Sequence, residues 1–246
     1  MRACAHTTYR DAEQTKQTFH KYTQFLNLIK IMGCFLTNSS LGRKLVMSIS
    51  GCFLVLFLLF HMSMNIAAIF SAEAYNAICA FLGANWYAVA GTGVLAAGVF
   101  VHFAYALMLT IQNRKARGQQ RYAVTVTEKG VSWASKNMLV LGVIVIGGLL
   151  VHMCHFWSKM MLVELMGEHS VVVGGMELAP TDGAALIAFT FSKWYNVLIY
   201  VVWLAALWFH LTHGFWSSMQ SLGWNNQIWI NRWKCISNIY STIIVL

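Results

Sequence analysis

Four of the nine histidines lie deep inside apolar segments of helical length, one in each of four consecutive segments: His61, His102, His152 and His210. An imidazole is costly to bury in hydrocarbon unless it has a partner. One role that supplies a partner is axial ligation of haem iron, in which two imidazoles from facing helices bind one metal ion. Another is a hydrogen bond across neighbouring helices. Haem ligation requires the four histidines to form two pairs, each at one depth.

The composition is that of an all-α integral membrane protein. Hydrophobic residues make up 58% of the 246 residues and charged residues only 10%, whereas a soluble domain carries about 25% charged residues. A helix needs roughly 20 apolar residues to cross the hydrocarbon core. Apolar runs near this length occur at 45–70, 86–112, 137–161, 189–219 and from 230 to 246. The sequence therefore predicts five transmembrane helices, four of them forming a haem-binding bundle.

The first 35 residues differ from the rest of the chain. Residues 1–35 mix charged and polar side chains and lack the continuous apolar core of a secretory signal. We expect a cytoplasmic extension in which 19–31 forms an amphipathic helix on the membrane surface. The alternatives are a disordered tail or a start codon assigned too far upstream of Met32. The membrane domain is predicted to cover 36–246, with Ser39 or Ser40 capping its first helix.

The basic residues predict which side of the membrane each loop faces. Lys and Arg concentrate before the first predicted span, between the second and third, and between the fourth and fifth: Arg43, Lys44, Arg114, Lys115, Arg117, Arg121, Lys129, Lys136, Arg232 and Lys234. The other two loops are acidic instead, with Glu73 in one and Glu164, Glu168, Glu177 and Asp182 in the other. By the positive-inside rule the amino terminus is cytoplasmic. The net charge of +9 is thus a topology signal, and it does not favour a nucleic-acid partner.

This topology sorts the histidines into two pairs. His61 lies 16 residues past Leu45 on an outward-running span, or roughly 24 Å at 1.5 Å per residue, and His152 reaches roughly 22 Å on the other outward span. His102 and His210 fall late on the two inward-running spans. We name His61 and His152 the outer pair and His102 and His210 the inner pair. Two pairs at two depths favour two bis-histidine haems.

Neighbouring residues leave alternatives open. His155 and His213 each lie three residues from a proposed ligand and share roughly its helix face. Small residues lie four positions before three of the proposed ligands, at Gly98, Gly148 and Ala206. They would let a porphyrin approach the backbone, or they would serve ordinary close packing of helices.

The haems are predicted to be of the b type. The six cysteines contain no C-x-x-C pair, so the C-x-x-C-H signature of covalent haem attachment is absent. The haems would be held by axial ligands and packing alone.

Several segments from residue 36 onward carry a resemblance to a known family: TNSSLGRK, FLLFHMSMN, QNRKARGQQRYAV, ASKNMLVLG, LLVHMCHFW and FHLTHGFWSSMQSLGW. They resemble the cytochrome b membrane subunit of succinate dehydrogenase/fumarate reductase, in the five-helix, dihaem, single-subunit type of Bacteroides-like bacteria. Relatives place a ligand histidine at the first His of an FH-x-x-x-G pattern, which matches His210. In the third span, a pattern of His followed by x-x-x-F/W matches His152.

The resemblance implies the membrane anchor of a respiratory complex II in the bacterial inner (cytoplasmic) membrane. A flavoprotein subunit with FAD and an iron-sulfur subunit would bind on the cytoplasmic side and carry out the dicarboxylate chemistry. Electrons from succinate would pass to the inner haem, then to the outer haem, and then to a membrane quinone, with menaquinone the family expectation. Fumarate reduction is the reverse.

One departure from the family concerns protons. Some dihaem relatives have a glutamate two residues before the ligand histidine of the fourth span, where this chain has Trp208. None of the five predicted spans contains an internal Asp or Glu, so a carboxylate relay across the bilayer is not expected. We expect an outer-side quinone pocket near the outer haem, with Glu73 and His155 as candidates for handling protons.

Two other functions compete with this one. A cytochrome b of a membrane hydrogenase or formate dehydrogenase also uses histidines within the membrane, but it lacks the FHLTHGFWSSMQSLGW pattern. A transporter or plain anchor would bind no haem, although the chain shows no paired repeats or broken Gly/Pro helices of a carrier.

Overall fold

The computed structural model describes residues 20–31, 33–117 and 132–246. Internal contacts divide the chain into two units, Met1–Val46 and Met47–Leu246, and each is described by itself.

In the first unit, residues 20–31 and 33–38 are helical. A helix is therefore present over the predicted range from residue 20, while Phe19 lies outside the described residues. Ser39 Oγ accepts the Gly42 N–H at 2.8 Å, which confirms Ser39 as a cap of the following helix. The apolar side chains at helical spacing in 20–31 are all exposed: Tyr22, Phe25, Leu26 and Ile29.

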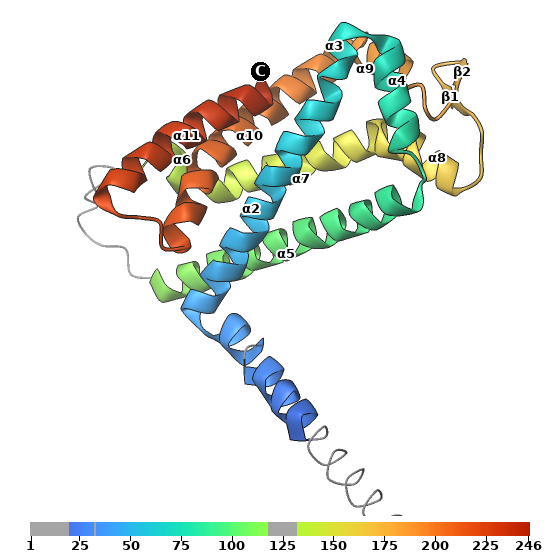
Figure 1. Cartoon of the computed structure of the whole chain (residues 1–246). Helices are drawn as coiled ribbons and strands as arrows, with labels where there is room; N and C mark the ends of the chain where they lie inside the picture. The colour runs from blue at the N-terminus through green and yellow to red at the C-terminus, as the bar shows by residue number, and fades with distance from the viewer. Residues whose placement is uncertain (1–19, 32, 118–131) are drawn as a thin grey trace, which may run out of the picture. The chain divides into compact units, whose positions relative to one another are not determined.

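Helices make up nearly all of the described chain, with one short β-hairpin (Figure 1). The all-α class predicted from composition is confirmed, because four of these helices are long and apolar enough to cross a membrane. The candidate spans are Ser40–Phe70, Trp86–Ala116, Met138–Lys159 and Trp194–Ser221. The helices are α2 (Ser40–Asn65), α3 (Ala67–Phe70), α4 (Ala72–Phe81), α5 (Trp86–Arg117), α6 (Trp133–Lys136), α7 (Met138–His155), η1 (Trp157–Lys159), α8 (Met161–Leu165), α9 (Gly183–Phe191), α10 (Trp194–Ser221) and α11 (Gln227–Val245). The antiparallel strands are β1 (Val171–Val173) and β2 (Met176–Leu178).

The fourth span begins later than the sequence predicts. The expected start at residue 189 falls inside α9, and α10 starts only at Trp194. Lys193 has an extended backbone that separates the two helices. The side chain of Asn196 donates to the Thr190 carbonyl at 2.8 Å and bridges the break. A polar residue near the start of an apolar run thus marks a helix boundary.

The fifth predicted span does form a helix, but its ability to cross a membrane is not confirmed. Helix α11 is 19 residues long. It is not among the described helices that are apolar enough to span, because Asn231, Arg232, Lys234 and Asn238 interrupt it.

Helix α10 packs along both α7 and α11. Against α11 the interface is made by small polar residues one turn apart, Ser237 and Ser241, both 0% exposed. Ser237 Oγ hydrogen-bonds to the carbonyls of Leu211 and Thr212, at 3.1 and 2.7 Å. Small residues let helix backbones approach closely, and hydroxyl groups that bond across the contact remain satisfied in an apolar setting.

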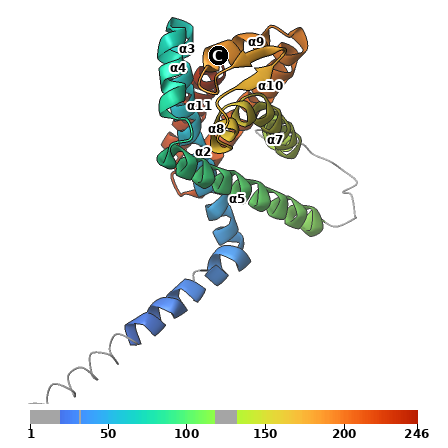
Figure 2. The ribbon, with the colours of Figure 1, turned by 90° about the vertical axis from the view of Figure 1, so that its right-hand side faces the viewer.

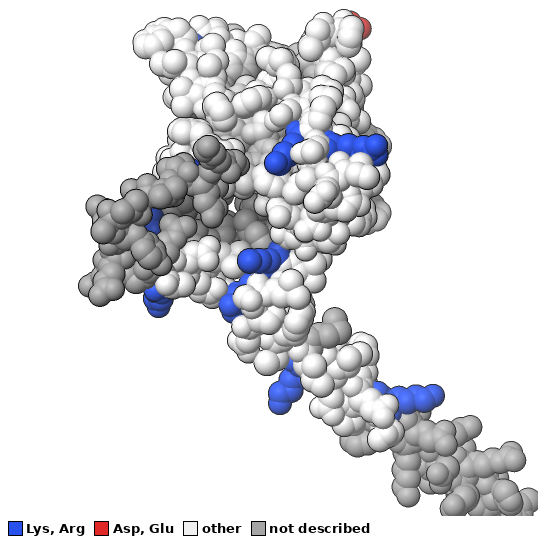
Figure 3. Space-filling model, turned by 90° about the vertical axis from the view of Figure 1, so that its left-hand side faces the viewer, with Lys and Arg blue, Asp and Glu red and all other residues white. Residues whose placement is uncertain are grey.

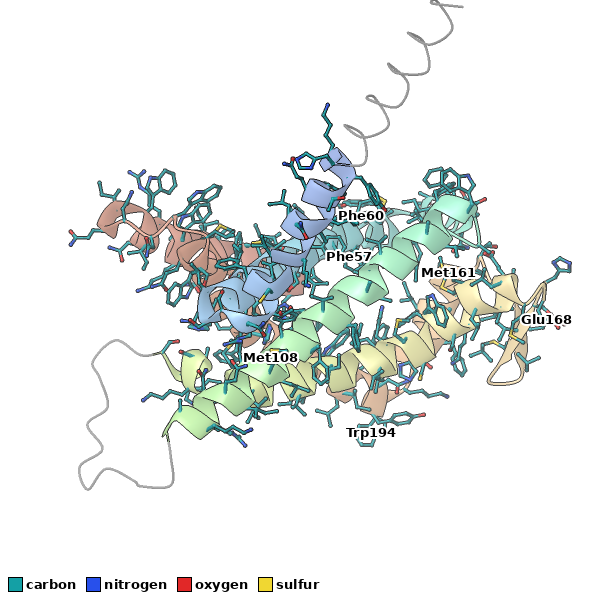
Figure 4. The ribbon with its side chains drawn as sticks, turned by 90° about the horizontal axis from the view of Figure 1, so that it is seen from below. Phe57, Phe60, Met108, Met161, Glu168 and Trp194 are labelled. Carbon is teal, nitrogen blue, oxygen red and sulfur yellow. The ribbon has the colours of Figure 1, made fainter. Side chains whose placement is uncertain are left out.

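The short elements of the second unit gather at one end of the long helices. Figure 1 shows α3, α4, α8, α9 and the β-hairpin at this end, which we call the cap, and Figure 2 shows the same end facing the viewer. Thr92 of α5 donates a hydrogen bond to the sulfur of Met161 of α8 at 3.5 Å, and this bond connects α8 to α5 (Figure 4).

The face of the molecule shown in Figure 3 presents charged side chains that are almost all basic among the described residues.

Candidate haem-binding site

The structure brings the four histidines together as two pairs, in the combinations that the sequence predicts. The rings of His61 on α2 and His152 on α7 have centroids 5.8 Å apart at an interplanar angle of 87°. The rings of His102 on α5 and His210 on α10 have centroids 6.4 Å apart at 69°. Each pair joins two spans that are not consecutive along the chain: α2 with α7, and α5 with α10.

The spacing within each pair suits two imidazoles on one metal ion. A metal–imidazole bond is about 2 Å long and the ring centre lies about 1 Å beyond the nitrogen, so two ligands of one ion have centroids about 6 Å apart. Both observed values, 5.8 and 6.4 Å, are close to this distance. The geometry therefore fits a bis-histidine iron site, with no other protein ligand needed.

The alternative of hydrogen bonds across helices fits less well. No hydrogen bond joins the two rings of either pair among the described residues. Nδ1 of His152 and Nδ1 of His210 are buried without a hydrogen-bond partner. A buried polar atom without a partner costs free energy, so packing alone does not account for these rings.

The two pairs lie at two levels along the helices. On α2, Ser50 contacts His102, with Oγ 3.2 Å from Nδ1, and His61 follows 11 residues later. On α7, a Cβ built on Gly142 would lie 3.9 Å from Cε1 of His210, and His152 follows 10 residues later. At 1.5 Å per residue the two levels are separated by about 16.5 Å along α2 and about 15 Å along α7. Two helices thus give similar separations independently.

Aromatic side chains surround the outer pair. Phe57, one turn before His61 and labelled in Figure 4, is stacked on that ring with centroids 5.5 Å apart. His152 contacts Phe156 and Trp203, with centroids 5.2 and 5.6 Å away. These contacts give the outer pair a largely apolar and aromatic surrounding.

The small residues one turn before the ligands serve helix packing. A Cβ at Gly148 would overlap the indole of Trp203, and one at Gly98 would lie 2.5 Å from Cε1 of Phe53. Ala206 belongs to the buried core with Leu141. At Gly98 and Gly148 the structure shows close packing, because aromatic rings fill the space where a porphyrin would approach the backbone.

The competing histidines have other neighbours. The ring of His155 is stacked on Tyr200, and its Nδ1 lies 3.3 Å from the Tyr200 hydroxyl. The ring of His213 contacts Trp216, with centroids 5.0 Å apart, and its Nδ1 is buried without a partner. Neither ring contacts His61 or His102. The structure therefore places His152 and His210, and not their neighbours, opposite the other two histidines.

The carboxylates near the predicted outer side have structural roles that the sequence did not suggest. Asp182 caps α9 by accepting from the Ala185 N–H at 3.1 Å, and it also accepts from the side chain of Asn76 at 2.8 Å. Glu164 Oε2 accepts from the Ala84 N–H at 2.6 Å. Glu73, the predicted proton-handling residue, is exposed in the first turn of α4. An Asp just before a helix was the available signal for the Asp182 cap.

Two titratable groups inside the cap are shifted by burial. Burial raises the pKa of the Cys79 thiol, although hydrogen bonds to Tyr75 and to the Gly183 backbone oppose the shift. Burial also raises the pKa of the Tyr75 hydroxyl, and Cys79 adds to that shift. The Tyr75 hydroxyl donates to Asn65 at 2.9 Å, which links α4 to the end of α2. Both groups are held neutral at physiological pH.

At the position where some dihaem relatives have a glutamate, Trp208 faces α11. Its Nε1–H donates to the Thr242 hydroxyl at 3.1 Å. This residue therefore takes part in packing α10 against α11.

Searches for related sites and proteins add no further identification. No group of three or more His, Cys, Asp or Glu side chains in the described residues is arranged to hold a metal ion, whereas a haem iron requires only two. No family model, curated protein or solved structure matches the chain.

Proposed function

We propose that this chain is the membrane anchor and dihaem cytochrome b subunit of a succinate dehydrogenase/fumarate reductase complex. The observation that carries the proposal is the pairing of the histidines, with ring centroids 5.8 and 6.4 Å apart at two levels. Two bis-histidine haems would give each of these four paired histidines a partner inside its apolar helix. The sequence resemblance supplies the kind of complex.

In this proposal the chain positions its cofactors and excludes water from them. His61 and His152 would hold one b-type haem, and His102 and His210 the other. When bound, each haem supplies a one-electron carrier within the membrane. Phe57 and Trp203 fix the outer imidazoles by direct ring contact. The separation of the levels along α2 and α7 would place the haems one above the other.

The partners follow from the same resemblance. A flavoprotein subunit with FAD and an iron-sulfur subunit would bind at the cytoplasmic end, where the loops are basic by the positive-inside rule. They carry the succinate and fumarate chemistry, so this chain acts as their electron-transfer subunit toward quinone, with menaquinone expected. The protein would reside in a bacterial cytoplasmic membrane with its amino terminus inside.

The quinone site is proposed near the outer pair. His155 lies at the end of α7 and contacts Tyr200. Tyr200 also lies beside His152, with ring centroids 6.3 Å apart, so Tyr200 connects His155 to the outer pair. Glu73 is exposed in the first turn of α4. Protons for the quinone would enter from this side. Binding of a quinone analogue should weaken in the double variant Glu73→Gln and His155→Phe, and unchanged binding would show that the site lies elsewhere.

Spectroscopy on isolated membranes tests the proposed function. A reduced-minus-oxidised difference spectrum should show b-type bands, and these bands should also appear when succinate is the only reductant. Bands that appear with hydrogen or formate, and not with succinate, would identify the other class of cytochrome b. The absence of b-type bands from the folded chain would identify a haem-free anchor or transporter.

A further inference from the structure

Ser50 on α2 is a buried residue whose hydroxyl contacts His102, one of the two proposed ligands of the inner haem. Ser50 is 7% exposed. Its Oγ donates to the Met47 carbonyl at 3.0 Å and lies 3.2 Å from Nδ1 of His102 on α5. A serine inside a helix often does no more than bond to a carbonyl one turn earlier, and Ser63 on the same helix bonds in this way to Phe60 at 2.7 Å. Ser50 differs from Ser63 in its second contact.

The two contacts together favour one tautomer of His102. A serine hydroxyl has one hydrogen to donate, and we assign it to the Met47 carbonyl, which can only accept. With this assignment, Nδ1–H of His102 donates to Ser50 Oγ. In a neutral imidazole this leaves Nε2 unprotonated.

The neighbouring residue provides the space for this contact. A Cβ built on Gly51 would lie 3.3 Å from Cε1 of His102, which is tighter than an ordinary contact. A glycine at this position lets the ring approach α2 closely enough for Ser50 to reach it. Ser50 and Gly51 thus together position the imidazole of His102 against α2.

The other member of the inner pair has no such support. Nδ1 of His210 is buried without a hydrogen-bond partner. Of the two inner imidazoles, therefore, only His102 is oriented by a hydrogen bond from its second nitrogen. Outer-shell bonds of this kind fix the tautomer and orientation of a ligand and increase its basicity.

We propose that Ser50 is a positioning residue that holds His102 in the Nε2-ligating tautomer and lowers the reduction potential of the inner haem. The inference rests on the proposed function. An imidazole made more basic by its Nδ1–H bond donates more strongly and favours the ferric state, so loss of the bond shifts the inner haem toward easier reduction. The outer haem, at the other level, is not affected.

The test is an optical redox titration of the purified full chain, with haem content measured on the same samples. The variants are Ser50→Ala, the conservative Ser50→Thr, which keeps a hydroxyl, and Ser63→Ala as a matched control on the same helix. A His61→Ala background, which should leave only the inner haem, shows which haem responds. Ser50→Ala is expected to raise the midpoint potential of the inner haem or to weaken its retention by about 10–100-fold. Ser50→Thr should restore the wild-type value, and Ser63→Ala should not change it.

Failure of this inference can be distinguished from failure of the proposed function. If the wild-type chain binds two haems and Ser50→Ala changes neither, or changes both equally, Ser50 has no positioning role. If Ser50→Thr behaves like Ser50→Ala, the effect is one of packing and the inference is wrong. If the folded wild-type chain binds no haem, the proposed function itself fails.

Discussion

The contact between Gly148 and Trp203 allows a sharp test of how the outer pair is held. Gly148 lies on α7 one turn before His152, and a Cβ at this position would overlap the Trp203 indole. Trp203 Nε1–H donates to the Val145 carbonyl at 2.9 Å, and its ring contacts His152 with centroids 5.6 Å apart. The substitution Gly148→Ala should therefore push Trp203 away from both.

The magnitude follows from these contacts. Overpacking a tight contact costs about 1–3 kcal/mol, and loss of the Trp203 hydrogen bond costs about 0.5–1.5 kcal/mol more. The higher helix propensity of alanine offsets about 1 kcal/mol. The matched control is Gly147→Ala on the same helix, because nothing lies within 4 Å of a Cβ there. The control gains the same propensity without the clash, so the two variants should differ by about 1.5–4.5 kcal/mol.

The assay is reversible unfolding of the purified chain in mixed micelles, followed by helix content, with haem content measured in parallel. Gly148→Ala should lower the free energy of unfolding and reduce occupancy of one haem, while Gly147→Ala should keep both haems. Equal stabilities for the two variants would show that Trp203 does not occupy the position that the structure gives it, and the account of the outer pair would be wrong.

Three further predictions concern the cap and the α10–α11 interface. Asp182→Ala removes a helix cap and should destabilise α9 by about 0.5–2 kcal/mol, measured as faster proteolysis of the cap. The pKa of the Cys79 thiol is raised by burial, so less reactive thiolate is present at a given pH. Alkylation of Cys79 in a single-cysteine variant should be slower than that of exposed Cys34 and should increase at alkaline pH. Ser237→Val fills a fully buried contact and should cost about 1–3 kcal/mol of unfolding free energy, whereas Cys235→Val on the exposed face of α11 should be neutral.

The outcomes that would contradict these predictions differ. Unchanged proteolysis of the Asp182 variant would mean that α9 needs no cap. If Cys79 and Cys34 react equally fast at neutral pH, Cys79 is not buried. The raised pKa of the Cys79 thiol also determines how stability depends on pH. Because the folded state favours the neutral thiol, the free energy of unfolding should fall as the pH rises above the pKa of a free thiol. Equal stability of Ser237→Val and Cys235→Val would exclude close packing at Ser237.

The long helices and the histidine pairs could be predicted from the sequence because both depend on simple periodic properties. Hydrocarbon thickness determines how long an apolar run must be, and the rise per residue converts a sequence position into a depth. His61 and His152 could therefore be matched before any contact was known. Their role as haem ligands remains a prediction that ring geometry supports.

Other features depend on contacts between distant residues and could not be predicted in this way. The break between α9 and α10 rests on Asn196 reaching Thr190, and the cap rests on Asp182 meeting Asn76, 106 positions apart. The small size of Gly148 was evident in the sequence, but the identity of its neighbour, Trp203, was not. The hydropathy pattern predicts the length of a helix and the membrane depth of a residue. It does not predict which side chain packs against a small residue such as Gly148.

Haem content in the four single His→Ala variants is the sharpest test of the two histidine pairs as haem ligands. We expect two b-type haems per wild-type chain. His61→Ala and His152→Ala should each remove the same haem, and His102→Ala and His210→Ala should each remove the other, as judged by the bands of the difference spectrum and the haem-to-protein ratio. A folded wild-type chain without haem, or a loss pattern that groups His61 with His102 or His210, would contradict this assignment.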